Sequence, residues 1–259
     1  MLNPYDFKKF YNLHEGESCF LFGDGPSIRM FDYSFFTKKI AITCGMQLFH
    51  RDFHKLDCPY YMLIEPYLFY PDWLLRTQKR QYLKNHRIIT NEIRNIIKAR
   101  SDMNFFLNLS NIFAIQRRNV FFLHKWLLYK DKKFKPFLDW EINPLASSYY
   151  SSLSLAMIMG FKKVFLVGFD AYNIRASSYR WYQKGYDQHH DLVEKIRDPF
   201  LEIYCENIEL FNISVEPTIS LAQHVSYQEF TGQNSLMQDN KSIINSSYLD
   251  LMNQRFDDI

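Results

Sequence analysis

Short apolar runs alternate with stretches of helical periodicity along most of this chain. The runs have the length of strands, and they cover residues 18–22, 39–44, 60–64, 163–168 and 208–215. Helical spacing is clearest over residues 147–160, just before one of these runs. Alternation of this kind favours a mostly parallel sheet covered by helices. We therefore expect an α/β fold consisting of a single Rossmann-like domain.

Further helices are predicted over residues 28–36, 74–100 and 199–207. Two other segments lack a steady period. Residues 171–191 are polar and aromatic, and because long loops in compact domains are usually functional or disordered, we expect a lid over about residues 171–190, after the central strand. The segment after Gln228 is polar and rich in Asn and Ser, so the tail from about residue 228 is expected to be weakly ordered.

The composition fits a globular protein with one core. The 259 residues are 47% hydrophobic and 23% charged, which allows residues 1–259 to form a single domain. Aromatic residues reach 18%, which suits a sugar-binding cleft but also follows from an AT-rich bacterial genome. The net charge of +3 is too small to indicate a nucleic-acid partner. Four cysteines without a CxxC pair, and no apolar run near the roughly 20 residues of a membrane span, lead us to expect a cytoplasmic protein.

Two segments, residues 74–100 and 117–135, combine many Lys and Arg with few acidic residues. The second also contains Phe121, Phe122 and Trp126. One interpretation is a solvated outer face. The other is a surface that approaches anionic lipid headgroups or an anionic glycolipid, because aromatic side chains among cations suit a membrane interface. This would place the protein at the inner face of the cytoplasmic membrane.

The segment Gly23, Asp24, Gly25, Pro26 and Ser27 directly follows the first apolar run. Small residues after a strand let backbone amides approach an anion, and a following helix adds a favourable dipole. The segment is neither a GxxxxGK[ST] loop nor a full dinucleotide fingerprint, which disfavours ATPase and NAD functions. It is either a nucleotide-binding loop or a structural turn without a ligand.

Other candidate site residues follow the later elements. Asp170 ends a predicted strand, where open α/β sheets bind ligands, although it could also cap a turn. Ser147 and Ser148 open a predicted helix, as N-caps or as phosphate ligands. His189 and His190 lie in the expected lid, where a histidine could accept a proton from a sugar hydroxyl or simply face solvent. There is no HExxH or DxD motif, so a transferase here would work without a metal.

Four segments resemble the bacterial sialyltransferases of glycosyltransferase family 42, a group typified by lipooligosaccharide enzymes. They lie between about residues 18 and 220, while residues 66–140 do not match. The segments are Gly23–Ile28 with Phe31–Ser34, Asn143 with Ser147 and Ser148, Met159–Tyr172 continuing to Ser177–Tyr179, and the His189–His190 pair leading to Phe200–Glu202.

The resemblance implies an inverting, metal-independent transferase on a GT-A-like variant of the nucleotide-binding fold, with no cofactor beyond its CMP-sugar donor. The loop at residues 23–27, Asn143, Ser147 and Ser148 would hold the CMP group. Tyr172 and Tyr179 would hydrogen-bond the departing phosphate, where negative charge grows in the transition state. His190 or His189 would deprotonate a hydroxyl of the acceptor, a glycan or glycolipid of a surface polysaccharide or lipooligosaccharide.

Two positions depart from the family pattern. Gly45 stands where the family has Asn in a Cys-Asn-Gln stretch, and Asn143-Pro-Leu145 stands where it has Asn-Gln-Arg. Because of these departures, the resemblance leaves the sugar open between sialic acid, Kdo and a related nonulosonic acid. The first loop also resembles flagellin-modifying transferases and a pterin pyrophosphokinase. A pyrophosphokinase that uses carboxylates among Asp24, Glu65 and Asp170, and a non-catalytic nucleotide-binding domain, remain alternatives, and the oligomeric state stays open.

Overall fold

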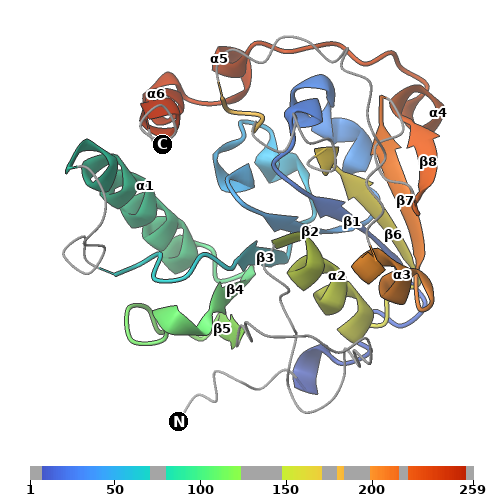
Figure 1. The fold of residues 1–259 in the computed structure, drawn as a ribbon, viewed down its shortest axis with the longest axis horizontal. Helices are drawn as coiled ribbons and strands as arrows, with labels where there is room; N and C mark the ends of the chain where they lie inside the picture. The colour runs from blue at the N-terminus through green and yellow to red at the C-terminus, as the bar shows by residue number, and fades with distance from the viewer. Residues whose placement is uncertain are drawn as a thin grey trace.

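The computed structural model describes residues 8–70, 80–123, 148–170, 180–183, 199–215 and 221–254. The described strands form one sheet in the order β5-β4-β3-β2-β1-β6-β7-β8, and every neighbouring pair is parallel. The strands are β1 Ser18–Phe22, β2 Ile40–Cys44, β3 Tyr60–Leu63, β4 Asn104–Asn108, β5 Val120–Leu123, β6 Lys163–Val167, β7 Glu209–Ser214 and β8 Gln223–Ser226. The predicted α/β class with a parallel sheet is confirmed (Figure 1).

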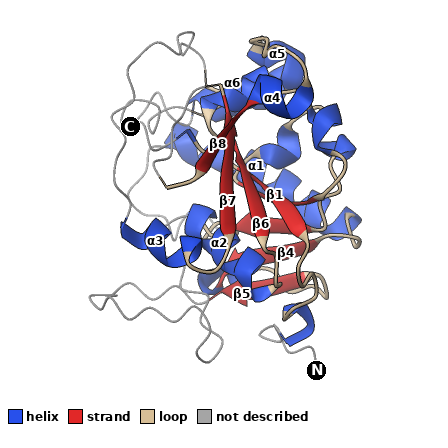
Figure 2. Cartoon of the chain, turned by 90° about the vertical axis from the view of Figure 1, so that its right-hand side faces the viewer, coloured by secondary structure: helices blue, strands red, loops and turns tan. Residues whose placement is uncertain are grey.

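Helices cover both faces of this sheet (Figure 2). They are α1 Arg80–Ala99, α2 Ser148–Ile158, α3 Pro199–Cys205, α4 Tyr227–Thr231, α5 Asn240–Ile243 and α6 Ser246–Gln254. Short 3-10 helices include η2 Pro26–Met30, η3 Tyr33–Phe36, η4 Gln47–Phe49 and η5 Phe53–Lys55.

Alternate residues of each strand serve two hydrophobic cores. In β1, Cys19 and Leu21 pack on the face covered by α2 and α3, while Phe20 and Phe22 pack on the face covered by α1, α4, α6 and the 3-10 helices. Successive side chains of a strand point to opposite faces, so a strand buried on both faces must be apolar throughout. This explains why central strands such as β1, β2 and β3 read as nearly continuous apolar runs in the sequence.

The strand order reverses next to β1. From β1 the sheet grows through β2 to β5 on one side, and then resumes with β6, β7 and β8 on the other side of β1. In open parallel sheets, ligands bind outside the carboxyl ends of the strands at such a reversal. The fold therefore singles out the loops that follow β1 and β6.

Five strands were predicted to within one residue at each end, namely β1, β2, β3, β6 and β7. The helix predicted over residues 28–36 is instead two 3-10 helices, η2 and η3, and α1 accounts for the described part of residues 74–100. Strands β4, β5 and β8 were not predicted, because their few apolar residues lie among polar or basic ones.

Two expectations from the sequence are wrong. Phe121 and Phe122, expected among cations at a surface, lie in β5 and are only 5% and 2% exposed. The tail after Gln228 was expected to be weakly ordered, but it contains α5 and α6, and its Ile243, Leu249 and Met252 are buried in the core. A few apolar residues are enough to hold these helices when each one packs against the core, and the many polar residues between them hide that pattern in the sequence.

None of the helices within the described ranges combines the length and the apolar character that crossing a membrane requires.

Candidate functional site

The loops after β1 and β6 are bonded to each other at the reversal of strand order. The Gly23 amide donates to the Val167 carbonyl at 2.9 Å, and the Gly25 amide donates to the Gly168 carbonyl at 2.7 Å. The Ser27 amide donates to Asp170 Oδ2 at 2.7 Å. The structure thus brings Asp170, which is 6% exposed, together with the Gly23–Ser27 loop, although 143 residues separate Asp170 from Ser27.

The glycines of this loop are required by the close approach of β6. A Cβ atom on Gly25 would lie 2.4 Å from Asp170 Oδ2, and one on Gly23 would lie 2.6 Å from the Gly168 carbonyl oxygen. Contacts below 3.0 Å are not seen for real Cβ atoms. The two glycines therefore allow the loops to pack together.

This arrangement corrects the reasoning that led to the phosphate cradle. The amides of Gly23, Gly25 and Ser27 donate to carbonyls and to the Asp170 carboxylate within the protein, so they are not directed at an anionic ligand. The element that follows the loop is also a five-residue 3-10 helix, whose dipole is small compared with that of a long α-helix. The group of the Gly23–Ser27 loop that remains a candidate for chemistry is the side chain of Asp24.

Asp24 is held by two donors from distant parts of the chain. The Met46 amide donates to Oδ2 at 2.9 Å, and the Trp181 indole N–H donates to Oδ1 at 3.0 Å. The Trp181 amide also donates to the Asp24 carbonyl at 3.1 Å. Gly45 has a φ of +68°, and a Cβ atom there would lie 1.8 Å from Asp24 Oδ2. The glycine that departs from the family pattern therefore makes room for this carboxylate.

The surroundings of Asp24 raise its pKa to about 6. Burial is the main cause, and the charge of Glu65 adds to it; the bonds from Met46 and Trp181 and the charge of Arg180 oppose it. The carboxyl group is surrounded by protein, yet the residue keeps partial exposure to solvent. A carboxyl group that titrates close to neutral pH can act as a proton donor or acceptor.

A second layer of side chains fixes the turn after β2. Gln47 Nε2 donates to the Gly23 carbonyl and Tyr33 Oη donates to Gln47 Oε1, both at 2.5 Å. The His50 ring stacks on Tyr33, with centroids 4.1 Å apart, and contacts Trp181 at 5.2 Å. Burial lowers the pKa of His50 to about 4, so this histidine is neutral at physiological pH. Its Nδ1 accepts a hydrogen bond from the Asp52 amide, which places the proton on Nε2.

The middle of the expected lid is already packed against the protein. Trp181 is fully buried and Tyr182 is 3% exposed. Asn253 of α6 donates to the Tyr182 carbonyl at 3.0 Å, and Asn240 of α5 donates to the Gln183 carbonyl at 2.8 Å. Residues 180–183 are therefore anchored between the site and the C-terminal helices. The rest of the expected lid, residues 171–179 and 184–190, lies outside the described residues.

The other predicted site residues fall into two groups. Ser148 begins α2, and Tyr149 next to it contacts Phe169 with ring centroids 4.8 Å apart, so the start of α2 lies beside the loop after β6. The remaining ones lie outside the described residues: Asn143, Ser147, Tyr172, Tyr179, His189 and His190.

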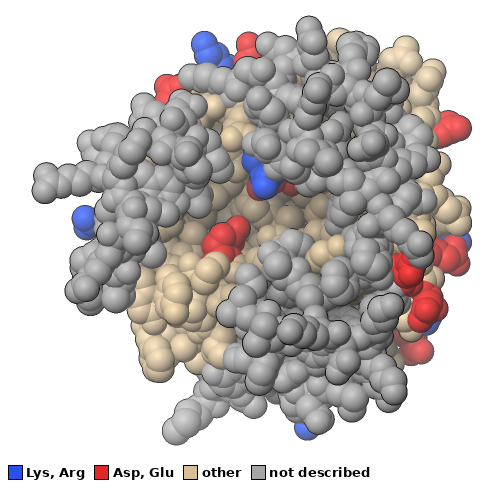
Figure 3. Space-filling view, viewed as in Figure 1, with Lys and Arg blue, Asp and Glu red and all other residues tan. Residues whose placement is uncertain are grey.

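Figure 3 shows that this face of the molecule is hollowed near its centre, and that acidic and basic side chains lie within the hollow. Within the described ranges, no group of three or more His, Cys, Asp or Glu side chains is arranged to hold a metal ion.

A scan against protein-family models, a search of curated proteins and a search of solved structures each gave no match to this chain.

Sequence reasoning missed most of the residues around Asp24. Trp181 and His50 carry no motif, and Gln47 became relevant only because it bonds Gly23. Gly45 was noticed as a departure from a family pattern, but its reason is the approach of Asp24. A glycine directly after a predicted strand was the one local signal available.

Proposed function

We propose that this chain is an inverting, metal-independent glycosyltransferase that moves sialic acid or a related nonulosonic acid from a CMP-sugar to a glycan hydroxyl. The observation that carries the proposal is the bonded pair of loops at the strand-order reversal, which bear the Gly23–Ser27 segment and Asp170. The resemblance to family 42 supplies the choice of CMP as the nucleotide.

In this proposal the donor lies across the carboxyl ends of β1 and β6, near Asp170, Ser148 and the Gly23–Ser27 loop. Asn143 and Ser147 bind the nucleotide. Tyr172 and Tyr179 bind the departing phosphate. His190 or His189 accepts the proton of the acceptor hydroxyl. The proposal also gives a role to Asp24. Because an anionic donor nearby raises the pKa of a carboxyl group further, donor binding favours the protonated form of Asp24, which can donate a hydrogen bond to the donor.

A thermal-shift panel of CMP, UDP, GDP and ATP, each with and without Mg²⁺, tests the donor class. A ligand at 100 times its dissociation constant stabilises the fold by about 2.7 kcal/mol, which is a readily measured shift. We expect a shift with CMP that does not depend on Mg²⁺. A shift with ATP that requires Mg²⁺ would instead support the pyrophosphokinase alternative.

Transfer and hydrolysis of CMP-sialic acid test the chemistry. We expect His190→Ala or His189→Ala, and Tyr172→Phe, to abolish turnover while CMP still shifts the melting temperature. His54→Ala is the matched control, because His54 is an exposed histidine on η5 outside the site. Near-normal turnover in both single histidine variants and in the double variant would refute the proposed base. CMP binding without hydrolysis of any CMP-sugar would support the non-catalytic alternative.

The acceptor is proposed to be a surface polysaccharide or lipooligosaccharide, met at the inner face of the cytoplasmic membrane. Since Phe121 and Phe122 are buried, they do not contribute to such an encounter. Exposed cations support this location: Arg87 and Lys98 of α1, and Arg117 and Arg118 just before β5. Co-sedimentation with vesicles that contain anionic lipid, compared with neutral vesicles, tests it.

A further inference from the structure

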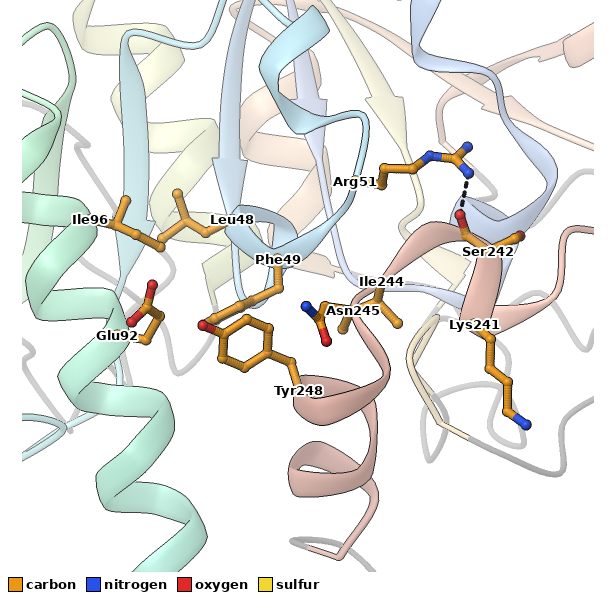
Figure 4. Close-up of a pocket in the computed structure, with 10 residues that line it drawn as sticks. All are labelled: Leu48, Phe49, Arg51, Glu92, Ile96, Lys241, Ser242, Ile244, Asn245 and Tyr248. Carbon is orange, nitrogen blue, oxygen red and sulfur yellow. Dashed lines mark hydrogen bonds between the residues drawn. The ribbon is translucent and has the colours of Figure 1, made fainter.

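A separate pocket lies between α1, α6 and the turn that follows β2. Its volume is about 410 Å³, within the range of small-molecule sites. Figure 4 shows its lining, in which Phe49, Tyr248 and Glu92 face one another and Asn245 lies next to them. Nothing in the proposed donor site uses these residues.

One turn connects this pocket with Asp24. Leu48 and Phe49 line the pocket, while Met46, just before them, donates to Asp24. The Leu48 amide donates to Tyr61 Oη at 3.1 Å, and this hydroxyl donates to the Gly45 carbonyl at 2.9 Å. Consecutive Cα atoms are about 3.8 Å apart, so at most about 11 Å separates Met46 from Phe49. The pocket and the Asp24 carboxyl therefore both contact the same short turn.

The lining suits a ring that carries hydroxyl groups. Phe49 and Tyr248 form an aromatic wall, with centroids 5.0 Å apart and an interplanar angle of 55°. The carbonyl of the Asn245 side chain caps α6 by accepting from the Ser247 amide at 3.0 Å, which leaves its amide nitrogen as a donor for a ligand. Aromatic faces pack against the C–H faces of sugars, and carboxylate and amide groups bond their hydroxyls.

One anion and two cations line the pocket: Glu92 lies beside the aromatic wall, whereas Arg51 and Lys241 lie on the side of Ser242 (Figure 4). Arg51 is paired with Asp52 and donates to the Ser242 carbonyl, and the Lys241 side chain extends away from the pocket (Figure 4). Glu92 instead faces Tyr248, and burial together with the charge of Glu92 raises the pKa of Tyr248. A carboxylate repels an anion, so the end of the pocket formed by Phe49, Tyr248 and Glu92 favours a neutral ring over an anionic one.

We propose that this pocket binds a neutral sugar ring of the acceptor glycan, one that precedes the reacting residue in the chain. The assignment to the acceptor rests on the proposed function, whereas the affinity for neutral sugars does not. The pocket thus separates acceptor recognition from the anionic donor at the edge of β1 and β6.

Saturation-transfer NMR with lactose, cellobiose and maltose at millimolar concentrations tests the site, with N-acetylneuraminate as the anionic probe. We expect at least one disaccharide to bind, with a loss of about tenfold, or roughly 1.4 kcal/mol, in Tyr248→Ala. Tyr248→Phe keeps the aromatic ring, so its affinity for the disaccharide should stay within about threefold of that of the unsubstituted protein. Tyr11→Ala is the matched control, because Tyr11 is exposed and lies outside the pocket.

Binding of none of the three disaccharides, equal binding by Tyr248→Ala, or stronger binding of N-acetylneuraminate at this pocket would overturn the proposal. The urea midpoint and the CMP-induced thermal shift show whether Tyr248→Ala is folded. In transfer assays, Tyr248→Ala should raise the KM for the acceptor and leave the KM for the donor unchanged. If disaccharides bind as expected but CMP does not, the sugar site stands and the CMP-sugar function fails.

Discussion

Replacing Asp24 with Asn should stabilise the protein at neutral pH and have little effect at acid pH. The pKa of Asp24 is raised from 3.8 to about 6, so the folded state binds a proton more tightly than the unfolded state. The stabilisation by this proton is complete below pH 3.8 and is lost as the pH rises through about 6. At 1.36 kcal/mol per pKa unit, ionised Asp24 costs up to about 3 kcal/mol at pH 7.5. Partial exposure of the residue makes this an upper bound.

His50 acts in the opposite direction over nearly the same pH range. Its pKa falls from 6.5 to about 4, so it adds stability above pH 6.5 that is lost as the pH falls toward 4. In the unsubstituted protein the two slopes largely cancel. Asp24→Asn removes one of them, and its stability should therefore rise with pH where that of the unsubstituted protein changes little.

Urea unfolding at pH 4 and pH 7.5 measures the effect. The asparagine Oδ1 can accept from both Trp181 and Met46, which lie 3.0 and 3.2 Å from Asp24 Oδ1, so any fixed cost of the amide cancels between the two pH values. Asp57→Asn, at an exposed position, is the control and should change the free energy of unfolding by less than about 0.5 kcal/mol. A gain for Asp24→Asn at pH 4 that equals or exceeds the gain at pH 7.5 would refute the reasoning.

Three further predictions concern the same network. Gly45→Ala should destabilise the fold by at least about 2 kcal/mol more than Gly232→Ala, because both glycines have positive φ but only Gly45 faces Asp24, and urea midpoints of the two variants measure the difference. Trp181→Phe removes the hydrogen bond to Asp24, so its cost of about 1–3 kcal/mol should be larger at pH 7.5, where Asp24 is ionised, than at pH 4; an equal cost at both would show that only packing was lost. CMP should bind more tightly at pH 5.5 than at pH 8, and calorimetry should show that its affinity for Asp24→Asn depends less on pH. The same pH dependence of CMP affinity in Asp24→Asn would show that Asp24 takes no part in the donor site.

The sequence by itself determined the fold class and the positions of five strands. A strand buried on both faces must be apolar at every position, and that requirement is visible within five residues of sequence. The Gly23–Ser27 loop and Asp170 were found for the same reason, because each directly follows such a run.

Only the tertiary structure decided which loops meet and what they do. The placement of β6 beside β1 brings Asp170 to Ser27. The amides of Gly23, Gly25 and Ser27, which the sequence suggested as ligands of a phosphate, instead bond to the loop after β6. The pKa of Asp24 depends on Met46, Glu65, Arg180 and Trp181, which come from three separate parts of the chain. The helices after Gln228 pack through a few apolar residues that a polar composition conceals. Local periodicity indicates which face of an element is buried. Burial of a particular carboxyl group depends instead on contacts between residues far apart in the sequence, and those contacts exist only once the sheet has formed.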